Sequence, residues 1–396
     1  MRRGGVRGVR SRQCPVGWLA ALVLGVVVTG TATAASPATV EWQLPAAVSH
    51  PPQTDAQKLA GRLHGRPLPQ REFLQPKLDA KLSTFVPAKV VELKGRFAVA
   101  ASDILPGLVR GWIHAFRKFY PNVQISFGSP FEGSLAAKHL NQGKVGIAFV
   151  SRELKPSYVA AFTHNHGYPP VSVPVSGGSY RHFGFLDAVV FFVNQKNPID
   201  RLSLAQLDSV LSQPAMGERG DATTWGQLGA TGAWAKQPIH VYGIKPWNGF
   251  EEFVRERVVD AGDVRRHWRK DMHFDPMVFP IAKRVAADPD GIGYAGLAFV
   301  DEPVKIISIG HDGHYVAPTY ANVASAAYPL SRLIYANVNL KPGTRLPKGE
   351  EEFLRFILSR QGQQIVLDQG VFLPLRSFQA SQAGKLIVPG PRGATR

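Results

Sequence analysis

Apolar positions in the middle of this chain alternate between short continuous runs and runs spaced by three or four residues. The run GRFAVAASD (95–103) predicts a buried strand, and the apolar positions of 104–120 recur at helical spacing, which predicts an amphipathic helix. NVQISF, LAAKHLNQG and VGIAFVS then continue as strand, helix and strand. Strands that alternate with helices predict a parallel sheet covered by helices, which is an α/β fold.

The same alternation continues in the second half of the chain. Further strands are predicted at DAVVFFVN, PIHVYGI, GIGYAGLAFV, VKIISIG and YPLSRLIYANVN. Helices are predicted at LSLAQLDSVLS, with Ser203 as its N-cap, at FEEFVRERVV, and at EEEFLRFILSRQGQQIVLDQG. From Ser377 onward the residues contain Gly, Ser and Pro, and we expect a frayed tail.

The N-terminus predicts a secretory signal peptide at residues 1–34. Five arginines precede the apolar run WLAALVLGVVV, and Ala32-Thr33-Ala34 is a small-residue cleavage site. The alternative is an uncleaved membrane anchor, but the run is short for a bilayer. Cys14 is the only cysteine and precedes the apolar run, so a mature chain would have no disulfide, no thiolate metal site and no lipid anchor. We therefore expect a protein secreted into the periplasm.

The charge and the motifs limit the possible functions. The formal charge is +17, and removing five arginines without an acid leaves 17 − 5 = +12. A basic surface can attract nucleic acid, a membrane or a small anion, but basic and aromatic residues do not interleave, so no nucleic-acid partner is expected. No serine-hydrolase elbow, zinc-protease helix or phosphate loop is present, so we expect no enzyme and no cofactor. We expect His164 and His166 to lie in an exposed loop, and HDGH (311–314) to form a hairpin. No metal site is therefore expected.

The order of segments from residue 95 to 375 resembles the phosphate-binding component of bacterial ABC importers, within the periplasmic binding-protein superfamily. The segments that carry the resemblance are AASDILPGLVRGWIHAFRKFYPNVQISF, GSPFEGS, GIAFVSREL, DAVVFFVNQKNPIDRLSLAQLDSVLS, TTWGQLG, GIGYAGLAFV, YPLSRLIYANVN and EEFLRFILSRQGQQIVLDQGVFLPL. The resemblance implies an α/β, two-lobed periplasmic binding protein of the type II kind, with two hinge strands and a central ligand cleft.

The resemblance also implies a division of the chain. DAVVFFVN would be the outgoing hinge strand and YPLSRLIYANVN the return. The expected parts are a signal peptide (1–34), an N-terminal extension (35–94), the first part of lobe one (95–187), lobe two (188–327), the return strand with the second part of lobe one (328–376), and a C-terminal tail (377–396).

Candidate ligand contacts in lobe one are hydroxyls and backbone donors at predicted helix starts, which suit a desolvated oxyanion. Ser102 and Asp103 end the first predicted strand, where the resemblance implies a ligand contact; the alternative is a helix cap. The turn GSPFEGS offers Ser129, Gly133 and Ser134, and the alternative is a connecting turn without a ligand.

A further candidate follows the third predicted strand, at Ser151 and Arg152. The resemblance implies a polar ligand contact at this place. The guanidinium of Arg152 could hold a phosphate-like group with two parallel hydrogen bonds. The alternative is a surface ion pair with Glu153 or Glu251.

Lobe two departs from the family pattern. Where the family has an Arg/Asp element followed by Gly-Ser-Gly-Thr, this chain reads GIKPWNGFEEF (243–253). Asn248, Gly249 and Phe250 stand at the corresponding helix start and could still contact an anion. Each hydroxyl donor lost from a buried oxyanion site costs about 1–3 kcal/mol when a group stays unpaired. Trp247 indicates room for a larger ligand.

These observations predict an exported solute-binding protein that binds inorganic phosphate, or a similar small oxyanion, between two lobes. It would deliver the ligand to a membrane ABC permease and act as a monomer, without metal or cofactor. One alternative keeps the fold but gives it another ligand, or a sensory or secretion-linked role. The others are an exported hydrolase and a structural or adhesive protein.

Overall fold

The computed structural model describes residues 76–88, 93–181, 186–213, 222–246, 249–259, 267–300, 302–311 and 313–388. The expected signal peptide and most of the expected N-terminal extension lie outside these ranges. Among the helices within them, none combines the length and hydrophobicity that a membrane crossing requires.

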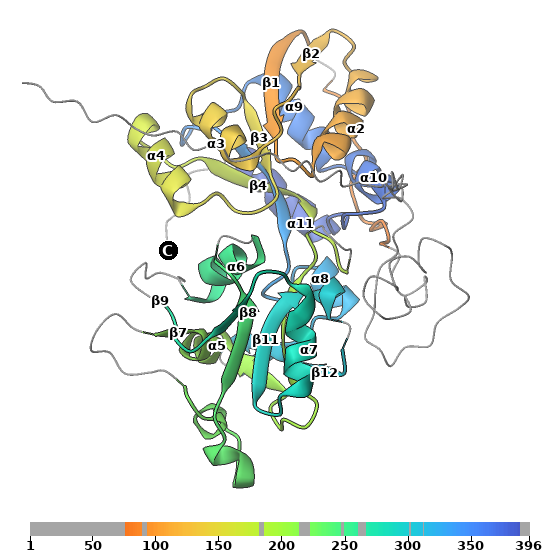
Figure 1. The fold of residues 1–396 in the computed structure, drawn as a ribbon. Coiled ribbons are helices and arrows are strands. Elements are labelled where there is room, and N and C mark those ends of the chain that lie inside the picture. Colours follow the sequence, from red (N-terminus) through yellow and green to blue (C-terminus); the bar gives the residue numbers. More distant parts are fainter. Residues whose placement is uncertain are drawn as a thin grey trace, which may run out of the picture. The chain divides into compact units, whose positions relative to one another are not determined.

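Lobe one is built on a five-stranded sheet with the order β2-β1-β3-β15-β4 (Figure 1). β1 (Gly95–Ala101) pairs in parallel with β2 (Val123–Ser126) and β3 (Ile147–Val150), as the alternation of strands and helices predicts. β15 (Leu333–Val338) comes from the second half of the chain and pairs antiparallel with β3 and β4 (Val171–Gly177). The sheet therefore joins two distant parts of the sequence.

Helices pack against this sheet through their apolar faces. On the first of them, Trp112 and Phe116 are fully buried, as the helical spacing predicts. The helices are α2 (Pro106–Arg117), α3 (Gly133–Asn141), α4 (Pro156–His166), α9 (Lys348–Ile357), α10 (Arg360–Gln369) and α11 (Ser377–Ile387).

Three expectations for lobe one were wrong. The long helix expected after residue 350 is two helices, because α9 ends at Ile357 and Ser359 caps α10 by accepting the Gly362 N–H at 3.3 Å. The described part of the expected tail, residues 377–388, forms α11, whose Ala383 and Ile387 are buried. His164 and His166 end helix α4 instead of lying in a loop.

Residues 76–88 of the expected N-terminal extension attach to lobe one. Phe85 packs edge-on against Phe119 and Phe356, with ring centroids 5.2 and 5.4 Å away. The Ser377 N–H donates to the Asp79 carboxylate at 2.9 Å. This part of the extension therefore belongs to the packed surface of the lobe.

Lobe two has its own five-stranded sheet, with the order β10-β8-β11-β5-β12. β8 (His240–Ile244) pairs in parallel with β10 (His273–Asp275) and β11 (Gly291–Gly296). β5 (Val189–Asn194) pairs antiparallel with β11 and with β12 (Val304–Ile306).

Smaller elements complete lobe two. Ser203 caps its helix as predicted, by accepting the Gln206 N–H at 3.0 Å. β13 and β14 pair antiparallel with His311 opposite His314, as the predicted hairpin requires. The strands are β6 (Arg201–Ser203), β13 (Ser308–His311) and β14 (His314–Val316) in one sheet, and β7 (Ser212–Gln213) and β9 (His267–Trp268) in another. The helices are α5 (Leu204–Leu211), α6 (Gly249–Val254) with a π-helical turn (Arg255–Val259), α7 (Phe279–Ala287), α8 (Tyr320–Ala324) and short 3-10 turns at Trp225–Leu228, Gly232–Lys236 and Leu297–Phe299.

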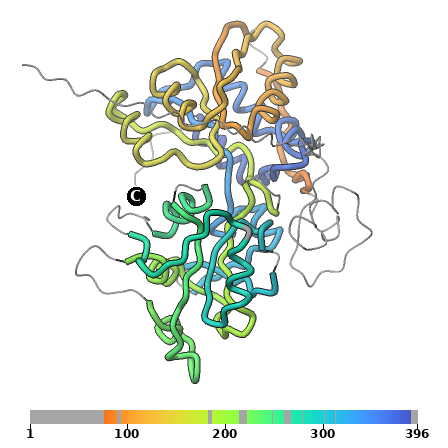
Figure 2. The backbone as a smooth tube through the Cα atoms, viewed as in Figure 1, coloured from red at the N-terminus to blue at the C-terminus, as the bar shows by residue number. Residues whose placement is uncertain are grey.

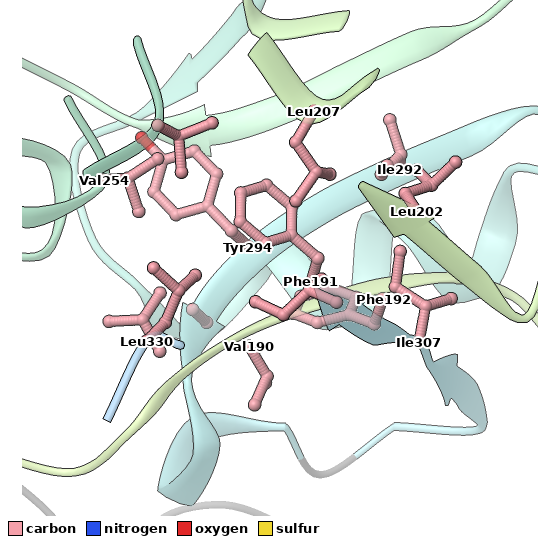
Figure 3. Close-up of a cluster of buried hydrophobic side chains, with 14 of the residues drawn as sticks. Val190, Phe191, Phe192, Leu202, Leu207, Val254, Ile292, Tyr294, Ile307 and Leu330 are labelled. Carbon is pink, nitrogen blue, oxygen red and sulfur yellow. The ribbon is translucent and has the colours of Figure 1, made fainter. Parts of the chain in front are cut away.

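Each lobe has its own hydrophobic core. Figure 3 shows the core of lobe two, where Phe191 and Phe192 of β5 lie near Tyr294 of β11. The rings of Phe191 and Tyr294 are 5.6 Å apart.

Two chain segments connect the lobes and lie side by side (Figure 2). The Gly178 N–H donates to the Arg332 carbonyl at 2.7 Å, and the Val189 N–H donates to the Leu330 carbonyl at 3.1 Å. The two expected hinge strands correspond to β5 and β15, which begin next to these crossings. β5 itself lies in the sheet of lobe two, and β15 lies in the sheet of lobe one.

Candidate functional site

Ser102 lies at the carboxyl end of β1, against the neighbouring strand β3. Its N–H donates to the Phe149 carbonyl at 2.9 Å, and the residue is 3% exposed. The alternative of a helix cap does not hold, because the N-cap of α2 is Leu105 and has no side-chain cap hydrogen bond. Asp103 is exposed, and its carboxylate accepts the Ile104 N–H at 3.1 Å.

Gly133 brings the first turn of α3 against these strand ends. A Cβ at this residue would lie 2.8 Å from Ser102 Oγ and 3.1 Å from Val150 Cγ1. Only glycine allows this close approach. The first-turn N–H groups of a helix have no acceptor within the helix, so this end of α3 offers donors to an anion beside Ser102.

The two serines of the same turn are placed differently. Ser129 is exposed, before a cis peptide bond to Pro130. The Ser134 hydroxyl donates to the carboxylate of Glu132, and Ser134 also lines a groove between α3 and α4. The hydroxyl of Ser134 therefore has a protein acceptor, while its N–H belongs to the first turn of α3.

Arg152 and Lys155 follow β3 and share one carboxylate of lobe two. Arg152 Nη1 lies 2.5 Å from Glu252 Oε2 and 4.0 Å from Glu256 Oε1. Lys155 Nζ lies 2.8 Å from the other oxygen of Glu252. The ion pair of Arg152 is thus with Glu252, and not with Glu153 or Glu251, the partners that sequence reasoning had considered.

These contacts change the acidity of both carboxylates. Burial alone would raise the pKa of Glu252, but the hydrogen bond from Lys155 and the charge of Arg152 hold it below its usual value. Burial raises the pKa of Glu256; Arg152 opposes this rise, and Glu252 adds to it. Glu252 is therefore the carboxylate that the two cations stabilise in its ionised form.

A second set of contacts joins the lobes next to Arg152. Glu153 accepts hydrogen bonds from the Arg257 guanidinium and, at 2.6 Å, from the Tyr335 hydroxyl. Burial raises the pKa of Tyr335, and the charge of Glu153 adds to this effect. A cavity of about 560 Å³ opens beside both sets of contacts, between the β3–α4 connection and α6.

The structure describes only part of the segment 243–253, where lobe two departs from the family pattern. Trp247 and Asn248 lie outside the described residues. Gly249 is exposed at the start of α6. The Phe250 ring packs edge-on against Phe299, with centroids 5.8 Å apart, and its face lies 5.6 Å from the Arg332 guanidinium. The Phe250 side chain thus serves packing near the crossings between the lobes.

Two charged residues near the crossings, Asp187 and Arg332, were not found by sequence reasoning. Asp187 is fully buried and accepts the Ala298 N–H at 2.8 Å. Burial raises its pKa to about 7, although the Ala298 N–H and the charge of Arg332 oppose the rise. Burial lowers the pKa of Arg332 to about 10, and its guanidinium lies 4.9 Å from the centre of the Phe253 ring. A charged residue within each of the apolar runs FLDAVVFF and PLSRLIY was the available signal.

Among the described residues, one group could hold a metal ion. The ligand atoms of His240, Asp288 and Asp290 lie within 4.8 Å of one another. Two of the three are already engaged, because Asp288 Oδ2 lies 2.8 Å from His240 Nδ1 and accepts the Tyr242 hydroxyl at 2.8 Å. The group lies on β8 and the α7–β11 turn, apart from the contacts of Arg152.

Comparisons with known proteins agree with this fold. A family model described as a PBP superfamily domain matches residues 91–361. The phosphate-binding protein PstS of Pseudomonas aeruginosa (strain PAO1) is 31% identical over 300 residues, which cover 75% of this chain and 88% of that protein. The phosphate-binding protein PstS of Staphylococcus saprophyticus is 27% identical over 202 residues, covering 50% of this chain and 58% of that protein.

A solved structure shares the fold. The crystal structure of PstS from Borrelia burgdorferi is 18% identical and has a TM-score of 0.52, covering 72% of this chain and 100% of that chain. The expected two-lobed α/β fold is thereby confirmed. The chain belongs to the PBP superfamily and, within it, to the PstS family.

Proposed function

We propose that this protein is an exported solute-binding protein that holds inorganic phosphate, or a similar small oxyanion, between its lobes and delivers it to a membrane ABC importer. The observation that carries the proposal is Arg152, placed two residues after β3, whose last residue Val150 lies with Ser102 against Gly133 at the start of α3. Membership in a family whose relatives are named phosphate-binding proteins supports the same function.

The proposed contacts combine three kinds of donor. The oxyanion would accept hydrogen bonds from the Ser102 hydroxyl, from the first-turn N–H groups at Gly133 and Ser134, and from the Arg152 guanidinium. Arg152 would release the Glu252 carboxylate and take the ligand instead. The same anion-binding chemistry makes Ser151 a further candidate.

Contacts from the second lobe would close the site over the ligand. The N–H groups of Gly249 and Phe250, at the start of α6, are the proposed donors there, together with Asn248. Asp103 and Ser129 are exposed, so their contribution would require closure around the ligand.

We infer binding without catalysis, because the relatives that the chain matches are named as binding proteins. A periplasmic location after export, and action as a monomer with a permease as partner, complete the proposal. The basic charge of the chain would raise the local concentration of anions near the cleft, an effect that salt weakens.

Calorimetric titration tests this function. The protein is unfolded and refolded to remove carried ligand, then titrated with phosphate, with sulfate as control, at fixed ionic strength. We expect phosphate to bind and sulfate to give no heat. If neither anion binds, the family fold has exchanged its ligand and the proposed function is wrong.

A further inference from the structure

The ion pairs of Arg152 and Lys155 join cations of lobe one to carboxylates of lobe two. Lobe one supplies Arg152 and Lys155, and lobe two supplies Glu252 and Glu256. We refer to these four residues as the four-charge group. Two cations face two carboxylates, so the formal charges of the group cancel.

The other charged residues that line the adjoining cavity pair with one another. Arg257 pairs with Glu153, and Arg255 Nε lies 3.1 Å from Glu251 Oε1. Trp268 also donates to this Glu251 oxygen, at 2.6 Å. Of the four-charge group, Lys155, Glu252 and Glu256 line the cavity, and Arg152 adjoins it through its pair with Glu252.

This charge balance disfavours a ligand that carries only negative charge. Such a ligand must displace Glu252 to reach Arg152, and its oxygens then lie beside two carboxylates. The raised pKa of Glu256 indicates that added negative charge is already disfavoured here.

A ligand with both an oxyanion and an ammonium group meets no such penalty. Its oxyanion would pair with the two cations of the four-charge group, and its ammonium would pair with the two carboxylates. Each protein charge then keeps an opposite partner, which buried or half-buried charges require.

The adjoining cavity has room for such a ligand. Its volume is about 560 Å³, and Leu154, Pro156 and Pro246 add apolar surface to its charged lining. Small-molecule sites commonly measure about 300–1,000 Å³ and combine apolar walls with a few polar groups. A tetrahedral oxyanion alone would leave most of this volume without contacts.

We propose that the cleft selects an aminoalkyl phosphate, whose phosphate contacts the two cations of the four-charge group and whose ammonium contacts the two carboxylates. This inference rests on the proposed function, because it places the oxyanion at the same site. It adds Glu252 and Glu256 as the residues that determine specificity.

Titration calorimetry with three probes tests the inference: inorganic phosphate, ethyl phosphate and 2-aminoethyl phosphate, at one ionic strength. We expect 2-aminoethyl phosphate to bind about tenfold or more tighter than ethyl phosphate, as a charged hydrogen bond provides. Glu256→Gln should bring the ratio of the two dissociation constants close to one. Glu302→Gln makes the same charge change in the turn before β12 and should leave the ratio as in the wild type.

The outcomes separate this inference from the proposed function. Equal binding of the two esters, or tightest binding of inorganic phosphate, would overturn the inference and leave the proposed function standing. A preference for the amine that survives both Glu252→Gln and Glu256→Gln would overturn the assignment to these carboxylates. If none of the three probes binds, both proposals are wrong.

Discussion

The guanidinium of Arg152, after β3 of lobe one, lies 2.5 Å from the carboxylate of Glu252, on α6 of lobe two. The carboxylate occupies the position beside Arg152 that a bound oxyanion would take. Under the proposed function, the anionic ligand and this acidic side chain would therefore compete for the same guanidinium.

Removal of the guanidinium should weaken phosphate binding. A hydrogen bond to a charged group contributes about 1.5–3 kcal/mol, so Arg152→Ala should raise the dissociation constant about tenfold or more. Arg117→Ala removes an exposed arginine at the end of α2 and is the matched control. Calorimetry that gives the same dissociation constant for both variants would rule out Arg152 as a ligand contact.

Removal of the competing carboxylate should strengthen phosphate binding. The Arg152–Glu252 pair is partly exposed, with side chains 22% and 23% accessible, and such pairs contribute about 0.2–1 kcal/mol. Glu252→Gln should therefore lower the dissociation constant for phosphate by a factor of about 1.4 to 5. Glu351→Gln, which removes the ion pair with Arg345 in lobe one, is the control and should have no effect. Weaker binding of phosphate by Glu252→Gln would contradict the competition.

The close packing of Gly133 against Ser102 predicts opposite effects of two glycine substitutions. Gly133→Ala should displace the Ser102 hydroxyl, weaken phosphate binding and destabilise the protein by about 1–3 kcal/mol, the usual effect of overpacking. Gly384→Ala, in α11 with no atom within 4 Å of the added Cβ, should instead stabilise by about 0.5–1 kcal/mol. Denaturant unfolding and phosphate titration of both variants provide the measurements. An unchanged phosphate affinity in Gly133→Ala would show that the start of α3 does not contact the ligand.

The buried carboxyl group of Asp187 should make the stability of the protein depend on pH. Its pKa rises from 3.8 to about 7 in the folded protein, where it lies near Arg332 and Arg181. A group with a raised folded pKa contributes stability that is present below its unfolded pKa and is lost as the pH rises through the folded value. The free energy of unfolding of the wild type should therefore fall, relative to Asp187→Asn, between about pH 4 and pH 7, by an amount on the order of a few kcal/mol.

Denaturant unfolding at intervals across this pH range measures the difference. Asp200→Asn is the control, since the Asp200 side chain is 74% exposed, and its pH profile should follow that of the wild type. Parallel profiles of Asp187→Asn and the wild type would show that Asp187 does not titrate in this range.

Much of the site followed from local sequence signals. The strands before Ser102 and Arg152, and the turn with Gly133, were placed correctly because hydrophobic periodicity and glycine act over a few residues. The partner of Arg152 did not follow, because Glu252 lies 100 residues further along the chain. The buried position of Asp187 near Arg332 was missed for the same reason, since burial of a charge depends on packing between distant segments.

The sequence by itself determined the alternation of strands and helices, the cap at Ser203 and the order of segments that marks the family. These features depend on local backbone preferences and on which face of each element is apolar. Only the tertiary structure decided that β15 completes the sheet of lobe one, that residues 377–387 of the expected tail fold as α11, and that Glu252 contacts Arg152. Contacts between distant segments depend on how the whole chain closes, and no local pattern encodes them.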